Sequence, residues 1–115
     1  MKFLLLLHGD TAAEAAMTDD ARRSVVDQHI AFGRHLSERG ARLLGEALAA
    51  PEEGRTIRFD GDDMLVTDGP FVEAKESLGG FYVIEAGSMD DATDLVRAVP
   101  RSPGLVAELR PIVDM

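Results

Sequence analysis

Residues 18–40 read TDDARRSVVDQHIAFGRHLSERG, a stretch with helical periodicity. One side of a helix drawn through this stretch carries a stripe of four residues: Val25, His29, Phe32 and Leu36. The opposite side carries charged residues. Thr18 is a suitable N-cap, and Gly40 suits the position after a helix C-terminus. The pattern predicts an amphipathic helix over Asp19–Arg39 that packs on a sheet.

The segment before this helix contains one short apolar run, Phe3–Leu7, which ends at His8 and Gly9. A run of this kind predicts a strand buried on both faces, and the small and polar residues 9–17 predict a loop. The run is shorter than the roughly 7–15 residues of a signal-peptide core or the roughly 20 of a membrane span. We therefore expect a cytoplasmic protein that does not associate with a membrane.

Beyond the helix, alternating apolar residues and turn signals predict further strands. They span Ala41–Ala49, Arg55–Asp60, Met64–Thr67, Gly80–Ala86 and Leu105–Ile112. A tight turn at residues 60–62 joins the second and third of these into a hairpin. Ser88 and Asp91 have the spacing of a capping box and predict a second helix, which Pro100 ends.

The predicted order is strand, helix, strand, inserted hairpin, strand, helix, strand, within one domain over residues 1–115. Two halves of this kind fold as a ferredoxin-like α+β sandwich, with one antiparallel sheet and both helices on one face. The other face of the sheet is left uncovered, so its apolar residues need a partner surface. We therefore expect a homodimer whose sheets pack face to face.

Composition narrows the function classes. The chain has 115 residues, of which 45% are hydrophobic, and a formal charge of −9. This apolar fraction is sufficient for a packed core in a single domain. The acidic balance argues against nucleic acid as a partner, because phosphate binding needs an excess of Lys and Arg. The absence of cysteine excludes disulfides, thiolate metal sites and cysteine nucleophiles.

Three histidines are the first candidates for chemistry. His29 lies within the apolar stripe of the first helix, where it is either a core histidine bonded to a backbone carbonyl or a general base beside a cavity. His8 ends the first strand and would bind substrate at the same end of the sheet, whereas His35 points away from the stripe. No pair of histidines has the spacing of a metal site, so we expect no metal. No motif demands flavin, nicotinamide or haem, so we expect no cofactor.

The connection at residues 67–81, TDGPFVEAKESLGGF, is crowded with charged groups. In one interpretation it is a turn whose Glu73 and Lys75 are solvated, and its glycine pair relieves a tight strand entry or a bulge. In a second, it is a rigid loop whose carboxylates and Lys75 line a substrate cleft. In a third, residues 68–71 form a turn at a dimer interface, where Phe71 packs on the partner subunit.

The same connection carries a family resemblance. Residues 66–82, VTDGPFVEAKESLGGFY, resemble the signature of the DGPF-domain branch of the YCII-related family. Residues 2–10 and 108–112 are similar to the family's two ends, so the resemblance covers essentially the whole chain. It implies a ferredoxin-like subunit that dimerises into an α/β barrel. Some relatives in the wider superfamily of dimeric barrels are cofactor-free enzymes.

The resemblance also implies a catalytic pair. The resemblance implies a His–Asp pair in a pocket, and the family's helical histidine matches His29. The aspartate that precedes a proline after the second helix in that family is Val99 here. Asp68 of the DGPF motif is therefore the nearest substitute, and Asp94 on the second helix is a poorer one.

Together these features predict a homodimer that binds a small molecule between the first helix, the sheet and the connection. His29 would act as acid and base, Asp68 would orient it or hold substrate, and Glu73, Lys75 and His8 would contact substrate without a cofactor. The alternative is a non-catalytic regulatory or sensor protein. Genes of the DGPF branch often neighbour extracytoplasmic-function sigma factors, and an acidic surface could dock a basic partner.

Overall fold

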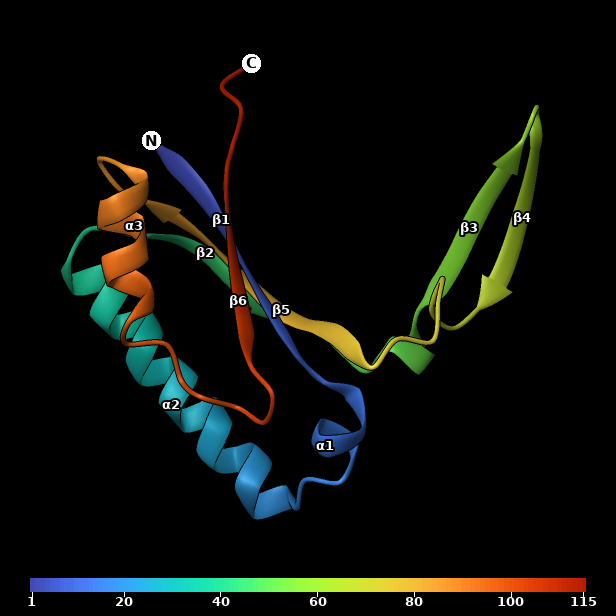
Figure 1. The fold of residues 1–115 in the computed structure, drawn as a ribbon, viewed down its shortest axis with the longest axis horizontal. Coiled ribbons are helices and arrows are strands. Elements are labelled where there is room, and N and C mark those ends of the chain that lie inside the picture. The colour runs from blue at the N-terminus through green and yellow to red at the C-terminus, as the bar shows by residue number, and fades with distance from the viewer.

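The computed structural model describes residues 1–115 and contains a four-stranded sheet, two covering helices and a separate hairpin (Figure 1). The strand order is β2-β5-β1-β6, and every neighbouring pair is antiparallel. These strands span Lys2–Asp10 (β1), Arg42–Ala47 (β2), Glu76–Glu85 (β5) and Val106–Pro111 (β6). Helices α2 (Asp19–Glu38) and α3 (Met89–Val96) lie on one side of the sheet. This confirms the α+β class, and the strand order is compatible with a ferredoxin-like fold.

The core lies between the sheet and the two helices. Every second residue of β1 is buried, because side chains alternate across a strand. The buried apolar cluster comprises Phe3, Leu5, Leu7, Phe32, Leu36, Ala41, Tyr82, Ile84, Ala92, Leu95 and Val99. Phe32 and Leu36 confirm the predicted inward stripe of α2. In the N-terminal half of α2 the packing loosens, since Val25 and His29 are only half-buried.

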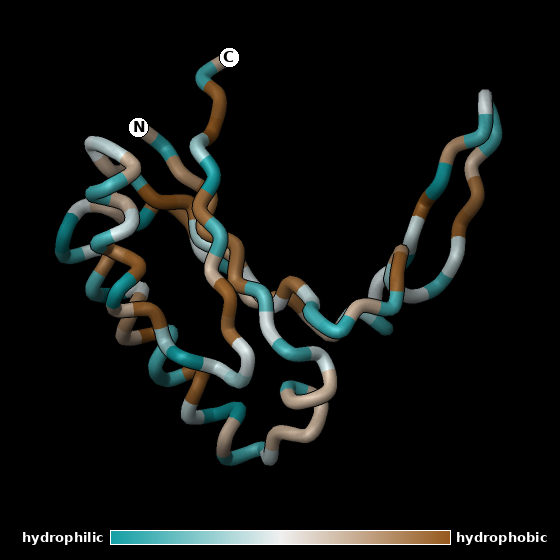
Figure 2. The backbone as a smooth tube through the Cα atoms, in the orientation of Figure 1, coloured by the Kyte–Doolittle hydropathy of each residue, from teal (hydrophilic) through white to brown (hydrophobic).

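Strands β3 (Arg55–Asp60) and β4 (Asp63–Asp68) form the predicted hairpin, which pairs with no other strand. A short 3-10 turn, η1 (Pro51–Glu53), precedes it. The hairpin projects on the side of the sheet away from the helices (Figure 1), and apolar residues recur along both of its strands (Figure 2). The radius of gyration is 16.0 Å, against about 13 Å for a compact chain of this length. The hairpin is therefore an arm that the rest of the chain leaves uncovered.

The segment between β1 and α2 differs from the prediction. The structure extends β1 to Asp10 and forms a short helix, α1 (Thr11–Ala15), where a loop was expected. The Asp10 carboxylate caps this helix by accepting a hydrogen bond of 2.8 Å from the Ala13 N–H. A helix of five residues is too short to produce a periodic pattern, so its sequence could not reveal it.

The start of β5 also differs from the prediction. The strand begins at Glu76 rather than Gly80, because the longer β1 supplies pairing partners for Glu76 and Ser77. The register shifts between Leu7 and His8, where Leu7 pairs with Gly80 and His8 with Leu78. The glycine pair therefore does lie at a β-bulge, as its sequence suggested.

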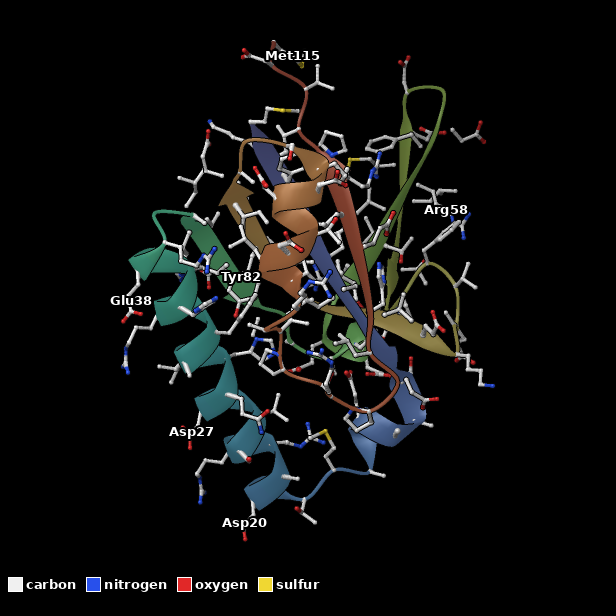
Figure 3. The ribbon with its side chains drawn as sticks, turned by 60° about the vertical axis from the view of Figure 1, so that its left-hand side comes forward. Asp20, Asp27, Glu38, Arg58, Tyr82 and Met115 are labelled. Atoms are coloured by element: carbon white, nitrogen blue, oxygen red, sulfur yellow. The ribbon has the colours of Figure 1, made fainter.

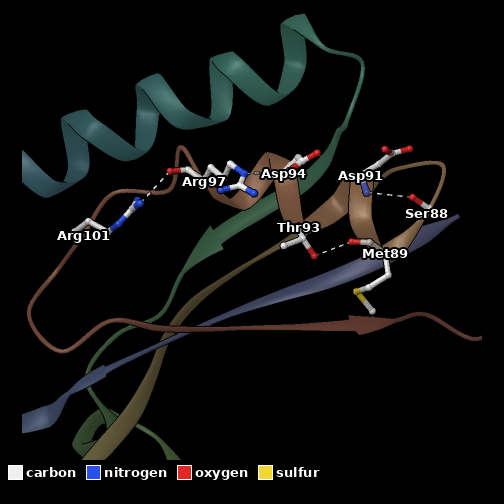
Figure 4. A network of polar contacts seen from close by, with 7 residues as sticks. All are labelled: Ser88, Met89, Asp91, Thr93, Asp94, Arg97 and Arg101. Carbon is white, nitrogen blue, oxygen red and sulfur yellow. Dashed lines mark hydrogen bonds and ion pairs between the residues drawn. The ribbon is translucent and has the colours of Figure 1, made fainter.

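Helix α3 is fixed at both ends by local hydrogen bonds (Figure 4). The Ser88 hydroxyl accepts a bond of 3.1 Å from the Asp91 N–H, which confirms the predicted cap. At the other end, the Arg101 guanidinium donates to the carbonyls of Val99 and Arg97. Both carbonyls lie just beyond Val96, the last residue of the helix, so these bonds fix the turn that follows it. Of all the helices, none is both long and apolar enough to span a bilayer.

Candidate functional site

A cleft of about 690 Å³ lies between α2 and the sheet, beside the loosely packed half of the helix. Its apolar lining includes Leu7, Val25, Val26, Ile30 and Leu105. Figure 3 shows Tyr82 of β5 between the sheet and α2, whereas Asp20, Asp27 and Glu38 point away from the body of the molecule. A mostly apolar concavity with a few polar groups is the usual character of a ligand site.

His29 and Tyr82 form the polar centre of the cleft. His29 Nδ1 lies 2.9 Å from Tyr82 Oη, and the two rings stack with centroids 6.0 Å apart. Phe32 packs edge-on against the Tyr82 ring, with centroids 5.2 Å apart and an interplanar angle of 88°. On β2, a Cβ at Gly45 would come within 2.5 Å of Tyr82 Cδ1, so only glycine leaves room for the ring. Tyr82 is thus held in place and in turn holds His29.

The surroundings also set the charge state of this pair. Burial lowers the pKa of His29 below its usual value of 6.5. Burial raises the pKa of Tyr82 above 10.0, and the charge of Arg42 opposes that rise. Both groups are therefore neutral at neutral pH. Because Nδ1 is engaged by Tyr82, Nε2 is the ring nitrogen left for a ligand, as a proton donor or acceptor according to the tautomer.

Glu14 of α1 is a second titratable group in the cleft. Its carboxylate lies so close to the backbone of Gly9 that a Cβ there would collide with it. Burial raises the pKa of Glu14 above 4.5, the positive charge of Arg22 opposes the rise, and Asp10 adds to it. Arg22 itself is engaged, because its Nη2 donates to the carbonyls of Glu14 and Ala15 at 3.0 and 3.3 Å.

Two further arginines line the cleft without a partner. Arg34 lies on α2, and Arg42 begins β2. The Arg42 side chain reaches across to the helix, where a Cβ at Gly33 would lie 3.3 Å from its Nε. Neither guanidinium forms an ion pair or a side-chain hydrogen bond. The cleft thus has two guanidinium groups without a side-chain partner, and the charge of one of them, Arg42, acts on Tyr82.

Of the other residues expected in the site, only His8 borders the cleft. Its side chain lies on the opposite face of the sheet, since it alternates with Leu7 along β1. There its Nε2 lies 3.1 Å from Glu108 Oε1. Glu108 lies on that same face, because it pairs with Leu6 across β1 and β6, and Leu6 and His8 are two residues apart on β1. The backbone of His8 therefore contributes to the cleft while its imidazole does not.

Asp68, Glu73 and Lys75 lie outside the cleft lining. Asp68 ends β4 on the hairpin, with a side chain 88% exposed and an oxygen 3.4 Å from Arg55 Nε. Glu73 and Lys75 are exposed in the connection that leads to β5. The expected pairing of His29 with Asp68 is therefore not formed within this chain, and Tyr82 is the partner of His29 instead.

Tyr82 could have been found from the sequence by its alternation with Ile84 on the same face of a strand. A buried tyrosine hydroxyl needs a hydrogen-bond partner, and His29 was predicted to face the same sheet. Glu14 and Arg42 gave no such signal, because α1 and the inner face of β2 were not recognisable. No group of three or more His, Cys, Asp or Glu side chains lies close enough together to hold a metal ion.

Comparison with known proteins identifies the family. The YCII-related domain matches residues 1–115. This chain belongs to the YCII-related family. It is also similar to an uncharacterized protein of Rhizobium meliloti (strain 1021), with 33% identity over 102 residues that cover 84% of this chain and 78% of the relative. The family thus accounts for the whole chain, whereas the chemistry of this YCII-related protein has to be argued from its own cleft.

Proposed function

We propose that this YCII-related protein binds a small molecule in the cleft between α2 and the sheet and uses His29 as an acid–base group. The contact of 2.9 Å between His29 Nδ1 and Tyr82 Oη carries the proposal. It fixes a neutral imidazole at the wall of an apolar cleft, where proton transfer near neutral pH is favourable. Tyr82 takes the orienting role that the family resemblance assigns to an aspartate.

The chemistry supported best is cofactor-free proton transfer at an acidic C–H bond of the bound molecule. The C–H bond breaks, its proton passes to His29 Nε2, and the carbon keeps the electron pair as an enolate or equivalent. For Nε2 to accept the proton, Nδ1 carries its hydrogen and donates it to Tyr82 Oη. The Tyr82 oxygen then stabilises the imidazolium that forms, as an orienting group does in other acid–base pairs.

Proton exchange in deuterium oxide tests this role. The probes are acetylacetone, ethyl acetoacetate and pyruvate, whose C–H exchange is followed by proton NMR near neutral pH. We expect the protein to accelerate exchange of at least one probe, and His29→Ala to abolish the acceleration. Tyr82→Phe should reduce it by about 10²-fold or less, because a positioned acid–base group contributes about 10²–10⁴-fold in total.

His35→Ala is the matched control, because it removes a second imidazole from the same helix and should leave the exchange rate unchanged. Exchange at the solvent rate with all three probes, or equal rates for wild type and His29→Ala, would refute the acid–base role.

The proposed functional unit is a cytoplasmic homodimer in which the sheets of two copies pack face to face as an α/β barrel. The uncovered face carries two apolar cross-strand pairs, Leu4 with Val83 and Leu6 with Phe81. The hairpin extends on that same side of the sheet (Figure 1), and its Phe59 is 73% exposed. Phe71, in the connection that follows β4, is 66% exposed. A second copy seated on the sheet would cover both surfaces, and apolar area of this kind is what stabilises a dimer.

The molecular mass in solution, measured by light scattering after size-exclusion chromatography, tests the dimer. A homodimer has twice the subunit mass of 12.4 kDa. Leu6→Glu should convert it to a monomer because it places a charge in the centre of the interface, whereas Ser24→Glu on exposed α2 should not. A wild-type monomer at high micromolar concentration would refute the dimer.

A further inference from the structure

We infer that the cleft selects small molecules that carry a carboxylate, which Arg34 and Arg42 bind beside His29. The inference rests on the proposed function, since it names the class of molecule that the same cleft takes. It is drawn from the two guanidinium groups rather than from the acid–base pair.

Arg34 and Arg42 are unpaired although the chain has an excess of acids. The chain has 21 Asp and Glu against 12 Lys and Arg. Three of the other arginines, Arg23, Arg55 and Arg97, do pair with carboxylates. Arg34 and Arg42 line the cleft and form no ion pair. A guanidinium presents a planar fork of donors that matches the two oxygens of a carboxylate, so two free ones on the same cleft favour an anionic ligand.

Arg42 lies between the sheet and the helix. It lies opposite Ile84 on β2 and β5, and its side chain reaches Gly33 of α2, so it spans the gap between sheet and helix. Its charge acts on the neighbouring Tyr82 hydroxyl. A carboxylate bound by Arg42 would therefore lie beside the pair of Tyr82 and His29.

Two carboxylates, those of Glu14 and Glu46, are among the lining residues. Glu46 pairs with Phe81 across β2 and β5, on the face opposite Gly45 and Tyr82, so its side chain points away from the cleft. Glu14 lies against Gly9, at the α1 end, where the charge of Arg22 acts on it. Neither competes for Arg42. The remainder of the wall is largely apolar, which suits a hydrocarbon or aromatic body behind the carboxylate.

Matched acids and amides test the inference. The probes are benzoate, phenylacetate and cinnamate, each paired with its primary amide, and binding is measured by protein-detected NMR titration. We expect the carboxylates to bind at least tenfold more tightly than the amides, and added salt to weaken only the carboxylates. Arg42→Gln and Arg34→Gln should each lower carboxylate affinity by about tenfold and leave amide affinity unchanged, whereas Arg42→Lys should retain part of it.

Arg23→Gln, on the same helix but outside the cleft, is the control and should change nothing. Equal affinity of acids and amides, the same loss in Arg23→Gln, or no carboxylate binding at millimolar concentration would overturn the inference. Failure of the proposed function has a different signature. In that case carboxylates would still bind, and their binding would depend on Arg42. His29→Ala and Tyr82→Phe would leave the proton exchange rate of every probe unchanged.

Discussion

Gly45→Ala tests whether the position of Tyr82 depends on the empty space beneath its ring. A methyl group at residue 45 would come within 2.5 Å of Cδ1 and 2.7 Å of Cε1 of Tyr82, so the ring must move. Overpacking of a buried site costs about 1–3 kcal/mol, and loss of the hydrogen bond to His29 costs about 1 kcal/mol. The lower entropy of an unfolded alanine offsets about 0.4–1 kcal/mol.

The net expectation is a loss of about 1–3 kcal/mol in the free energy of unfolding, measured by urea denaturation at fixed protein concentration. Near the melting temperature this corresponds to a decrease of about 4–12 °C. Gly54→Ala is the control, because its Cβ would meet only the Pro51 carbonyl at 3.4 Å. Wild-type stability in Gly45→Ala, together with unchanged NMR signals of the His29 ring, would refute the reasoning.

Three further predictions concern stability. Leu36→Ala should lower the free energy of unfolding by about 2–5 kcal/mol in a denaturant titration, because Leu36 is 0% exposed; a loss below 1 kcal/mol would contradict its place in the core. The pKa of His29 is lower in the folded than in the unfolded state, so the unfolded state binds more protons just below pH 6.5. Stability should therefore fall as the pH drops from about 6.5 through the folded pKa, and His29→Gln should reduce that slope; an identical pH profile would contradict this. Ser88→Ala should cost about 1 kcal/mol by removing the cap of α3, and equal losses in Ser88→Ala and the exposed control Ser24→Ala would argue against the cap.

The parts of the fold that sequence predicts well are those with long periodic patterns. The stripe from Val25 to Leu36 located α2 to within a residue of its observed end, and alternation in Arg55–Asp60 matched β3. The segments that the sequence pattern did not predict are short, or they form a strand only by pairing with residues far away in the chain. Residues 76–79 are in a strand only because an extended β1 pairs with them, and nothing local in their sequence indicates that pairing.

Only part of the candidate site could be predicted, because some of its residues follow from local patterns and others from the strand order. His29 was identified because its position in a helical stripe is a local property, and the structure does place it on the cleft. Its partner depends on which strand lies beneath it, and the strand order β2-β5-β1-β6 brings Tyr82 there while it leaves Asp68 on the hairpin. Arg42 reaches the cleft for the same reason, since β2 is the edge strand beside β5.

The pKa and the tautomer of the His29 ring show most directly whether His29 and Tyr82 form the centre of the cleft. Long-range nitrogen–proton NMR spectra of the histidine rings, recorded from pH 5 to 8 in wild type and Tyr82→Phe, report both the pKa and the tautomer of each imidazole. We expect His29 to have a pKa below 6.5 and to hold one tautomer in wild type, and Tyr82→Phe to alter the His29 signals but not those of His35. A His29 that titrates as a free histidine, with signals indifferent to Tyr82→Phe, would contradict the claim that the two residues form the working centre of the cleft.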